Sequence, residues 1–482
     1  MTRAHAQRLS QMDRSFLVYE NPRAPMHVGA VVILDARPLR TDEGGVDVAR
    51  IEEYLAARLH LIPRYRQRLA WTPIERHPVW VDDDRFQLRY HVRHTRLPRP
   101  GSERQLARVA GRIFSQHLDR DRPLWELWVI EGLEGDRFAL VTKIHHCMAD
   151  GVAGAELLAA LLTATPVAKP DPPPVWLPRP PPGDLALARD ALVRALATPF
   201  EVAGAAWEAV RAPRALAARA RELLGAASRT LASGIGPAPA TPFNQPIGPY
   251  RRVAWLVMDL SRVRRTAKAL GGTVNDVVLT VVAGGVRRFL RRQRHEDVDH
   301  LDFRVLTPVN TRRPTPERRF GNYVSAWIVR LPLDERDPRA AFRRVHEQTV
   351  QLKERHAERA VEALARTSAL TGPLLLALGA RLVNAGAAPF QMVVTNVPGP
   401  RQQLYLLEAP LLDVHPLVPL LGTLGIGVAV FSYRDHLSWG FTADWDLVPD
   451  LHAFARGVET AFERLCRAAG TAEKPDDGAP PA

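Results

Sequence analysis

The chain has 482 residues, of which 46% are hydrophobic and 24% are charged, a balance typical of a globular protein rather than a disordered one. Its length predicts two domains of ordinary size, and its two cysteines, Cys147 and Cys466, argue against a disulfide framework and favour a reducing compartment. The net charge of +13 is carried by arginines spread along the whole chain without any nucleic-acid-binding signature, so we expect no nucleic-acid partner.

The first residues lack the apolar core of a signal peptide, and the next 150 or so alternate between helical and strand patterns. Ser10 is placed to cap a short helix that ends before Pro22. Apolar residues at helical spacing predict helices over 46–59 and 105–117. Alternating apolar runs predict strands over 30–34, 86–97, 123–130 and 138–146, the last two pairing as a hairpin.

An HHxxxDG motif, formed by His145, His146, Asp150 and Gly151, lies where the strand 138–146 ends and a loop begins. Neighbouring side chains of a strand point to opposite faces, so one histidine can be buried as a support while the other faces an open space. Imidazole titrates near neutral pH, and the exposed histidine is therefore suited to act as a general base.

The motif has other possible interpretations. An isolated histidine is most often a hydrogen-bonded core residue without a catalytic role. A metal site and a cysteine nucleophile are both disfavoured here. Adjacent histidines on a strand diverge, and no further Cys or His stands at ligand spacing, so we expect no metal. Cys147 has no second thiol nearby and belongs to no separate Cys/His signature, which argues against a cysteine nucleophile.

Composition changes after residue 165. Residues 166–182 are rich in proline, which fixes φ and removes backbone donors, so we expect an extended connector there. Residues 185–233 form an Ala- and Arg-rich helical pattern broken at Pro199 and Pro213. We interpret it as a helix pair packed across two domains, with an amphipathic helix on a lipid surface as the alternative.

A second α/β pattern begins near Arg252. Strands are predicted over 253–260, 303–309, 323–331 and 392–396, followed by a hairpin of 426–433 and 437–443. Helices are predicted over 261–270 with Ser261 as its cap, 273–289, 338–371 and 449–466, and the tail from 470 is expected to be disordered. The uncharged run 414–433 is long enough to cross a bilayer, but its prolines and glycines favour a buried turn and strand.

Both ends of the helix 273–289 carry polar groups of interest. At its start, Thr273 or Asn275 suits a helix cap with Asp276 in the first turn, and support of an active site is the alternative. At its end lies an arginine cluster, for which a solvated helix end is favoured over a patch for phosphates or lipid headgroups; it comprises Arg287, Arg288, Arg291, Arg292 and Arg294.

Taken together, the motifs resemble a known family. HHxxxDG is similar to the motif of the CoA-dependent acyltransferase superfamily. The other motifs, in order, resemble the bacterial wax ester synthase/diacylglycerol acyltransferase family from about residue 9 to residue 468; they are LS…D…FL…E over 9–20, PMHVG over 25–29, PLWE over 123–126, ND at 275–276, GN at 321–322 and NVPGP over 396–400. The long insert near 166–240 departs from the family pattern.

The resemblance implies an α/β fold of two chloramphenicol-acetyltransferase-like domains with mixed sheets and helices. Residues 1–165 would form the N-terminal domain with HHxxxDG, and residues 246–469 the C-terminal domain. Residues 166–245 would be a Pro/Ala-rich helical linker, and residues 470–482 a disordered tail.

The resemblance also implies transfer of a long-chain acyl group from acyl-CoA to the hydroxyl of diacylglycerol or a long-chain alcohol, giving a triacylglycerol or a wax ester. His146 would be the general base and His145 its support. Asp150 would hold the loop through an ion pair with an arginine, and Gly151 would let the backbone turn. Acyl-CoA would be a co-substrate, and no cofactor or covalent acyl-enzyme is expected.

Further residues follow from the same resemblance. Asn275 and Asp276 would support the site. A group at the domain interface would shape a substrate tunnel that ends at His146; it comprises Pro123, Leu124, Trp125, Asn322, Asn396, Pro398 and Gly399.

We expect a cytoplasmic protein that attaches peripherally to an anionic membrane or lipid-droplet surface. One alternative is a non-catalytic lipid-binding or lipid-droplet protein on the same fold, against which the intact His146 and Asp150 argue. Another is a condensation-type ester-forming enzyme, which the missing carrier domain disfavours. The preferred acceptor, the acyl chain length and the oligomeric state stay open.

Overall fold

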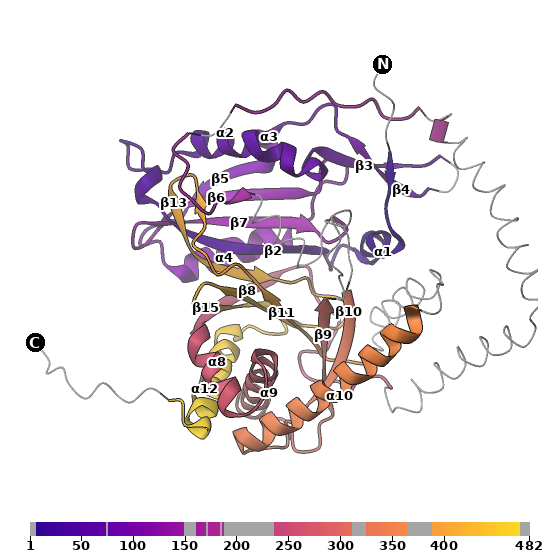
Figure 1. Ribbon diagram of the computed structural model, residues 1–482, viewed down its shortest axis with the longest axis vertical. Helices are drawn as coiled ribbons and strands as arrows, with labels where there is room; N and C mark the ends of the chain where they lie inside the picture. The colour runs from indigo at the N-terminus through magenta and orange to yellow at the C-terminus, as the bar shows by residue number, and fades with distance from the viewer. Residues whose placement is uncertain are drawn as a thin grey trace, which may run out of the picture.

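The computed structural model describes residues 6–73, 76–148, 161–169, 172–183, 186–187, 236–310, 324–364 and 388–472. These residues form two six-stranded mixed sheets, each accompanied by helices, and a small three-stranded sheet. Figure 1 shows one large sheet above the other, with helices over the upper sheet, between the sheets and below the lower one. The expected α/β architecture is confirmed.

The upper sheet has the strand order β12-β13-β2-β7-β6-β5. Its core consists of β2 (His27–Asp35), β6 (Trp125–Leu133) and β7 (Arg137–His145), and β6 and β7 form the predicted hairpin. The prediction of one strand over 86–97 was wrong in its first half, because Leu88–His91 form the short helix α3 and only β5 (Val92–Arg96) pairs with β6. The turn is fixed by His91, whose ring is buried and stacks on Trp125 while its Nδ1 lies 2.9 Å from the carbonyl oxygen of that residue.

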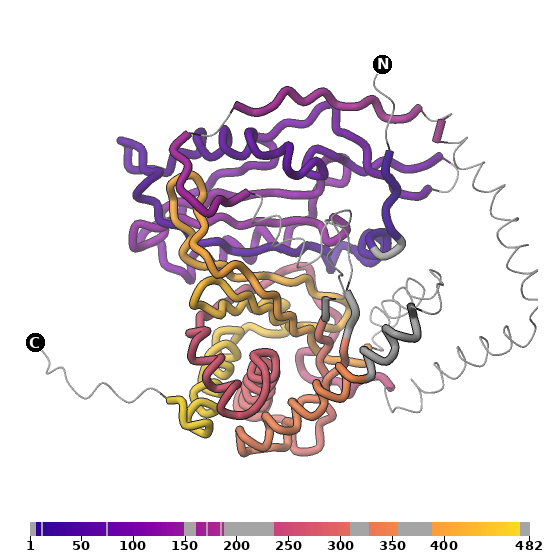
Figure 2. Tube along the Cα trace, viewed as in Figure 1, coloured from indigo at the N-terminus to yellow at the C-terminus, as the bar shows by residue number. Residues whose placement is uncertain are grey.

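Two strands of the upper sheet come from the far end of the chain. β13 (Ala409–Leu417) pairs antiparallel with β2, and the short β12 (Tyr405–Leu406) pairs with β13. In Figure 2 this segment reaches up in orange beside indigo and purple strands. A strand from the expected C-terminal domain, residues 246–469, therefore lies in the sheet that is formed mainly by residues 1–165.

The lower sheet has the order β10-β9-β11-β14-β15-β8. The predicted hairpin is present, and the other strands lie close to their predicted positions; the six strands are β8 (Arg251–Asp259), β9 (Phe303–Asn310), β10 (Val324–Leu331), β11 (Met392–Pro398), β14 (Ile426–Tyr433) and β15 (His436–Asp444). The uncharged run 414–433 is therefore a strand end, a turn and a strand, as predicted.

Helices cover the lower face of this second sheet (Figure 1); they are α8 (Leu260–Ala269), α9 (Val274–Gln293), α10 (Pro338–Leu364) and α12 (Leu451–Ala469). The predicted cap of α8 was wrong: β8 ends one residue earlier than expected, so Asp259, not Ser261, accepts the hydrogen bond from the amide of Arg262. No single described helix is long and apolar enough to cross a membrane, and only α8 and α9 together, bent by 96°, have the required composition.

Helix α4 (Glu103–Ser115) lies between the two large sheets and joins them. A Cβ added to Gly111 would lie 2.7 Å from the carbonyl oxygen of Arg251, so the helix and β8 are in close contact. The amide of Arg251 donates to Ser115 Oγ over 2.9 Å, and the indole of Trp255 donates to Glu103 over 3.1 Å. The upper sheet thereby rests on the lower one through α4.

The remaining described elements belong to the N-terminal half. Helix α1 (Gln11–Tyr19) is capped by Ser10 as predicted, and α2 (Val48–Arg58) lies above the upper sheet. The small sheet has the order β1-β4-β3 and comprises β1 (Gln7–Arg8), β3 (Gln67–Trp71) and β4 (Pro78–Asp82). Residues 172–183 contain no helix or strand, in agreement with an extended connector, and Arg179 in this segment pairs with Asp82 over 2.9 Å. The helices predicted within 185–233 lie almost wholly outside the described residues, as does the tail from 473.

Candidate active site

The two adjacent histidines lie at the end of β7, at the edge of the upper sheet. His145 is the last residue of the strand and sits opposite His27, the first residue of β2. His145 is fully buried, whereas His146 is half buried. The predicted division into one buried and one more open histidine is therefore present.

His146 is held by its backbone and by its ring. Its amide donates to the carbonyl oxygen of Met26 over 2.8 Å. Its imidazole stacks on Phe16 of α1, with ring centroids 3.9 Å apart and ring planes inclined by 9°. Helix α1 therefore fixes the plane in which this imidazole lies.

His145 is fixed from three sides. Its amide donates to the carbonyl oxygen of Leu124, and its Nδ1 accepts from the amide of Cys147 over 3.1 Å. Because Nδ1 accepts, the proton of the neutral ring is on Nε2. Nε2 lies 3.5 Å from Oε1 of Glu20, the residue that ends α1.

The buried side chain of Glu20 is the centre of a group that we call the Glu20 cluster; it comprises Glu20, His27, His117, Arg120 and His145. His27 Nε2 and His117 Nδ1 each lie 3.5 Å from the same Oε1 of Glu20. Arg120 donates to the other carboxylate oxygen through Nε over 3.1 Å and through a terminal nitrogen over 2.8 Å. Several cationic or hydrogen-bonding groups thus converge on one carboxylate.

Burial and these contacts shift the pKa values within the Glu20 cluster. Burial alone would raise the pKa of Glu20, but its contacts with His117, His145 and His27 bring that pKa well below its usual value, so the carboxylate is ionised. Burial lowers the pKa of His27 to about 3, which keeps this ring neutral. The contact with Glu20 raises the pKa of the half-exposed His117.

The Glu20 cluster is connected to His146 through the backbone of Met26. The amide of Met26 donates to Glu20 Oε1 over 3.2 Å, and its carbonyl oxygen accepts from His146. Phe16, four residues before Glu20 on the same chain segment, contacts the His146 ring. The position of His146 consequently depends on Glu20, although Glu20 itself contacts His145.

Cys147 does not suit a nucleophile. Its side chain is buried, and this burial raises the pKa of the thiol well above its usual value. The reactive thiolate is therefore disfavoured. Among the residues that the structure describes, no group of three or more His, Cys, Asp or Glu side chains is arranged to hold a metal ion.

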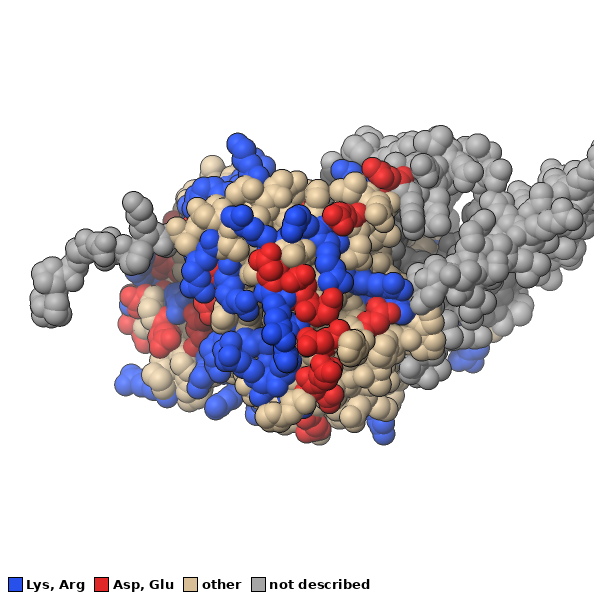
Figure 3. Space-filling model, turned by 90° about the horizontal axis from the view of Figure 1, so that it is seen from below, with Lys and Arg blue, Asp and Glu red and all other residues tan. Residues whose placement is uncertain are grey.

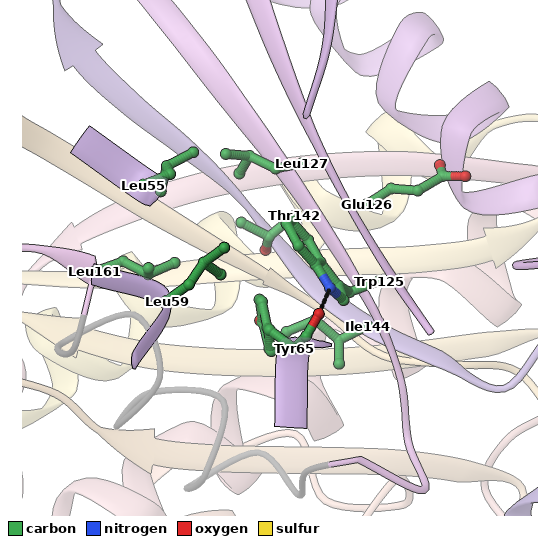
Figure 4. Close-up of a pocket in the computed structure, with 9 residues that line it drawn as sticks. All are labelled: Leu55, Leu59, Tyr65, Trp125, Glu126, Leu127, Thr142, Ile144 and Leu161. Atoms are coloured by element: carbon green, nitrogen blue, oxygen red, sulfur yellow. Dashed lines mark hydrogen bonds between the residues drawn. The ribbon is translucent and has the colours of Figure 1, made fainter. Parts of the chain in front are cut away.

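Leu124 and Trp125 of the PLWE motif lie next to the end of β7, where Trp125 pairs with Ile144. The carbonyl oxygen of Leu124 accepts from His145, and Trp125 stacks on Tyr65 and donates its indole proton to the carbonyl oxygen of that residue over 2.9 Å. These rings border an apolar cavity beside the strand ends (Figure 4) of about 20 Å³, room for about one water molecule. The motif supports the strand that carries the histidines, and this cavity alone does not accommodate an acyl chain.

Asp276 has a structural environment of its own at the start of α9. Of the two predicted caps, Thr273 is the one in use, and Asp276 in the first turn accepts from the Thr273 amide over 2.8 Å. The buried carboxylate also accepts from Thr349 over 2.7 Å and lies 2.9 Å from Nδ1 of His346, both on α10. Asp276 therefore ties α9 to α10, while Asn275 beside it is half buried.

The NVPGP segment ends β11 and packs close to β14. A Cβ at Gly399 would lie 2.3 Å from both a ring carbon of Phe431 and the carbonyl oxygen of Ser432. Asn396 and Pro398 lie opposite Val430 and Ser432 in the parallel pair. Phe431 belongs to the same apolar cluster as Cys147 and Met148, so β14 of the lower sheet contributes to the core around the histidine loop.

Three residues expected at the site, Asp150, Gly151 and Asn322, lie outside the described residues. The structure brings together His145, His146 and Leu124 directly, and it places Asn275 and Asp276 against α10. Glu20 and His27 belong to two of the sequence motifs but carry no expected role, whereas His117 and Arg120 belong to none. The available signal was Glu20 itself, a glutamate of the first motif, but its partners come from three separate segments, namely β2, β7 and the segment after α4.

The chain is similar to known proteins over most of its length. Residues 9–278 match the model of the wax ester synthase/diacylglycerol acyltransferase catalytic domain, and residues 320–466 match the model of the C-terminal domain of that family. A putative diacylglycerol O-acyltransferase of Mycobacterium tuberculosis (strain CDC 1551) is 35% identical over 471 residues, covering 96% of this chain and 90% of the relative. A probable diacylglycerol O-acyltransferase of the H37Rv strain is 33% identical over 473 residues, covering 95% of each chain.

Solved structures share the fold. The wax ester synthase/diacylglycerol acyltransferase from Marinobacter aquaeolei VT8 superimposes with a TM-score of 0.71 at 26% identity, over 96% of this chain and all (100%) of that one. The first condensation domain of the calcium-dependent antibiotic synthetase has a TM-score of 0.59 at 18% identity, over 98% and 99% of the two chains, which shows a common fold.

Proposed function

We propose that this chain, which belongs to the wax ester synthase/diacylglycerol acyltransferase family and is an O-acyltransferase, uses His146 as the general base of acyl transfer. The acyl donor is a long-chain acyl-CoA, and the acceptor is the hydroxyl of diacylglycerol or of a long-chain alcohol. The products are a triacylglycerol or a wax ester and free CoA.

The chemistry requires a base because a hydroxyl is a poor nucleophile at neutral pH. A ring nitrogen of His146 takes the hydroxyl proton as the oxygen attacks the thioester carbonyl carbon. When the tetrahedral intermediate collapses, the C–S bond breaks and the imidazolium returns the proton to the departing CoA sulfur. The base thus ends unchanged, and no covalent acyl-enzyme is formed.

The observation that carries this proposal is the way the His146 ring is held. Its face lies parallel to Phe16 at 3.9 Å, and the negative face of an aromatic ring favours the imidazolium that forms during the reaction. Its amide is anchored on Met26, and the neighbouring His145 is immobilised by the Glu20 cluster. A base that is oriented before the substrate arrives loses little orientational freedom in the transition state.

The place of action is part of the proposal. The chain works in the cytoplasm, peripherally attached to an anionic membrane or lipid-droplet surface, because both acceptors are apolar molecules that reside in such phases. The net charge of +13 supports attraction to an anionic surface. Acyl-CoA is a co-substrate, and the reaction as written needs no further cofactor.

The experiment is an assay of CoA thiol release from palmitoyl-CoA with dioleoylglycerol or hexadecanol dispersed in detergent. Replacing His146 by Ala is expected to reduce alcohol-dependent release by about 10²–10⁴-fold, the usual contribution of a general base. His60→Ala, at an exposed position on the N-terminal half, is the matched control and is expected to keep full activity. Release that survives in His146→Ala would place the base elsewhere, and absence of release with either acceptor would favour a non-catalytic lipid-binding protein.

A further inference from the structure

An open hollow lies between α9, α10 and α12, below the lower sheet and on the far side of these helices from the upper sheet. Its volume is about 470 Å³. Figure 3 looks onto this end of the molecule and shows a dense group of basic side chains across it. Six arginines line the hollow; they are Arg287, Arg288, Arg291, Arg292, Arg336 and Arg464.

Helical periodicity produces the hollow. One face of α9 contributes small residues in its middle and then two turns of arginines; the lining residues are Thr280, Ala283, Gly284, Arg287, Arg288, Arg291 and Arg292. At Gly284 the helices touch, since an added Cβ would lie 2.6 Å from Cβ of Ala461 on α12. Small residues therefore form the floor, and the long side chains around them form a basic rim.

The carboxylates near the hollow do not balance this charge. Arg287, Arg291 and Arg336 share one carboxylate, that of Asp299, at 3.1, 3.9 and 3.8 Å. Glu335, which also lines the hollow, accepts from the backbone amides of two following residues over 2.7 and 2.9 Å.

The outer arginines of the rim are uncompensated. Arg288, Arg292 and Arg464 are exposed, and within the described part of the chain no carboxylate lies within ion-pair distance of any of them. Arg464 donates to the backbone carbonyl of Arg336 over 3.2 Å, which holds its guanidinium on the α10 side of the hollow. By contrast, Arg294, the last member of the arginine cluster, is neutralised by Asp450 over 2.7 Å.

We propose that this hollow binds a phosphate group. Guanidinium groups match phosphate oxygens in paired hydrogen bonds, and several arginines around one concave site are the arrangement that phosphate recognition uses. A simple solvated helix end would need neither the concave floor nor the two further arginines, Arg336 from the segment before α10 and Arg464 from α12. The phosphate is that of an anionic phospholipid headgroup, or it is a free phosphate. The lipid source rests on the proposed action at an anionic surface.

The test compares Arg288→Gln/Arg292→Gln with the control Arg108→Gln/Arg112→Gln. Both pairs are exposed arginines one helical turn apart, and the control pair lies on α4. Binding of each protein to phosphatidylcholine vesicles, with and without phosphatidylglycerol, is measured by flotation at fixed ionic strength. Melting temperature is measured in inorganic phosphate and in sodium chloride of equal ionic strength.

The hollow variant is expected to bind phosphatidylglycerol vesicles about 30-fold more weakly than wild type, because two basic residues at an anionic surface contribute about 2 kcal/mol and 1.4 kcal/mol is tenfold. The control variant is expected to stay within about threefold of wild type. A free-phosphate site would instead give equal vesicle binding and a phosphate-dependent rise in melting temperature that only the hollow variant loses. Equal behaviour of all three proteins in both assays, or equal weakening by both pairs, would overturn the proposal.

Failure of this site is separable from failure of the proposed function. Thiol release in detergent, without vesicles, is expected to be the same in Arg288→Gln/Arg292→Gln as in wild type. A hollow variant that is inactive in detergent and has a lowered melting temperature would show a folding role for these arginines and overturn the binding site. The assay of His146→Ala tests the catalytic proposal whatever the vesicles show.

Discussion

Replacing Glu20 by Gln is expected to destabilise the protein by about 3 kcal/mol. The carboxylate accepts two hydrogen bonds from Arg120 and one from the amide of Met26, and hydrogen bonds to charged groups contribute about 1.5–3 kcal/mol each. Removing one partner of a buried ion pair costs about 3–5 kcal/mol. The loss of stability in Glu20→Gln is expected near the lower end of this range for two reasons. Gln retains an acceptor for one or two of these donors, and Arg120, which is 40% exposed, recovers hydration.

The pH dependence of this loss follows from the two pKa shifts. Glu20 has a lowered pKa, so its stabilising contribution is present above its unfolded pKa of about 4.3 and is lost as pH falls below that value. His117 has a raised pKa, so its contribution is complete below about 6.5 and is lost as pH rises through its higher folded value. The stability difference between wild type and Glu20→Gln is therefore expected to be widest near pH 5–6.

The assay is thermal unfolding from pH 3 to pH 9, together with alcohol-dependent thiol release at a temperature where both proteins are folded. Glu52→Gln is the control, since Glu52 pairs over 3.1 Å with Arg89, which is 83% exposed, and such surface pairs contribute about 0–1 kcal/mol. Glu20→Gln is expected to lower kcat and to change KM little. The substitution weakens the hydrogen bond to the Met26 amide, and the carbonyl oxygen of Met26 holds the amide of His146. Equal melting temperatures for the two variants, or a stability difference independent of pH, would refute the role assigned to the Glu20 cluster.

Two further predictions concern the lower sheet and its helices. Asp276→Ala removes the carboxylate that accepts hydrogen bonds at the start of α9 and from α10. We expect the free energy of unfolding to fall by about 3 kcal/mol and amide hydrogen exchange in α10 to become faster. Unchanged exchange in α10 would contradict the link between the two helices. Gly399→Ala is expected to cost about 1–3 kcal/mol by overpacking, whereas Gly183→Ala, where an added Cβ meets open space, is expected to leave the melting temperature unchanged. If the Gly399→Ala protein is as stable as the control, the end of β11 can shift to make room for the added methyl group, and the overpacking prediction is wrong.

Local signals in the sequence predicted most elements well. The hairpin of β14 and β15 follows from apolar alternation on both sides of a two-residue turn, in which Arg434 has a φ of 51°. The start of α9 was predicted from Thr273 or Asn275 as the cap with Asp276 in the first turn, and the structure uses Thr273. The predicted cap of α8 was wrong because Asp259 and Ser261 are both residue types that cap helices well. The choice between them depends on where β8 ends, which is set by its pairing in the folded sheet.

The site was predictable only in part. HHxxxDG located the two histidines, and strand alternation anticipated that one is buried and one more open. The Glu20 cluster was not predictable because its members come from α1, β2, β7 and the segment after α4, and only the folded chain brings them within 3.5 Å of one carboxylate. Strand patterns also do not say which sheet a strand joins, so the passage of β13 into the upper sheet could not be inferred.

That passage of β13 has a consequence for the order of events at the ribosome. β2 pairs with β7 on one side and with β13 on the other, and Gly29 lies opposite Leu417 in the second pair. At about 5–20 residues per second, the nascent chain carries an open β2 edge for on the order of 20–80 s before its partner is made. During that interval an unpaired row of backbone donors and acceptors is exposed to other chains. The upper sheet therefore becomes complete only after Leu417 has been synthesised, and the N-terminal half is not a unit that can finish folding before β13 is made.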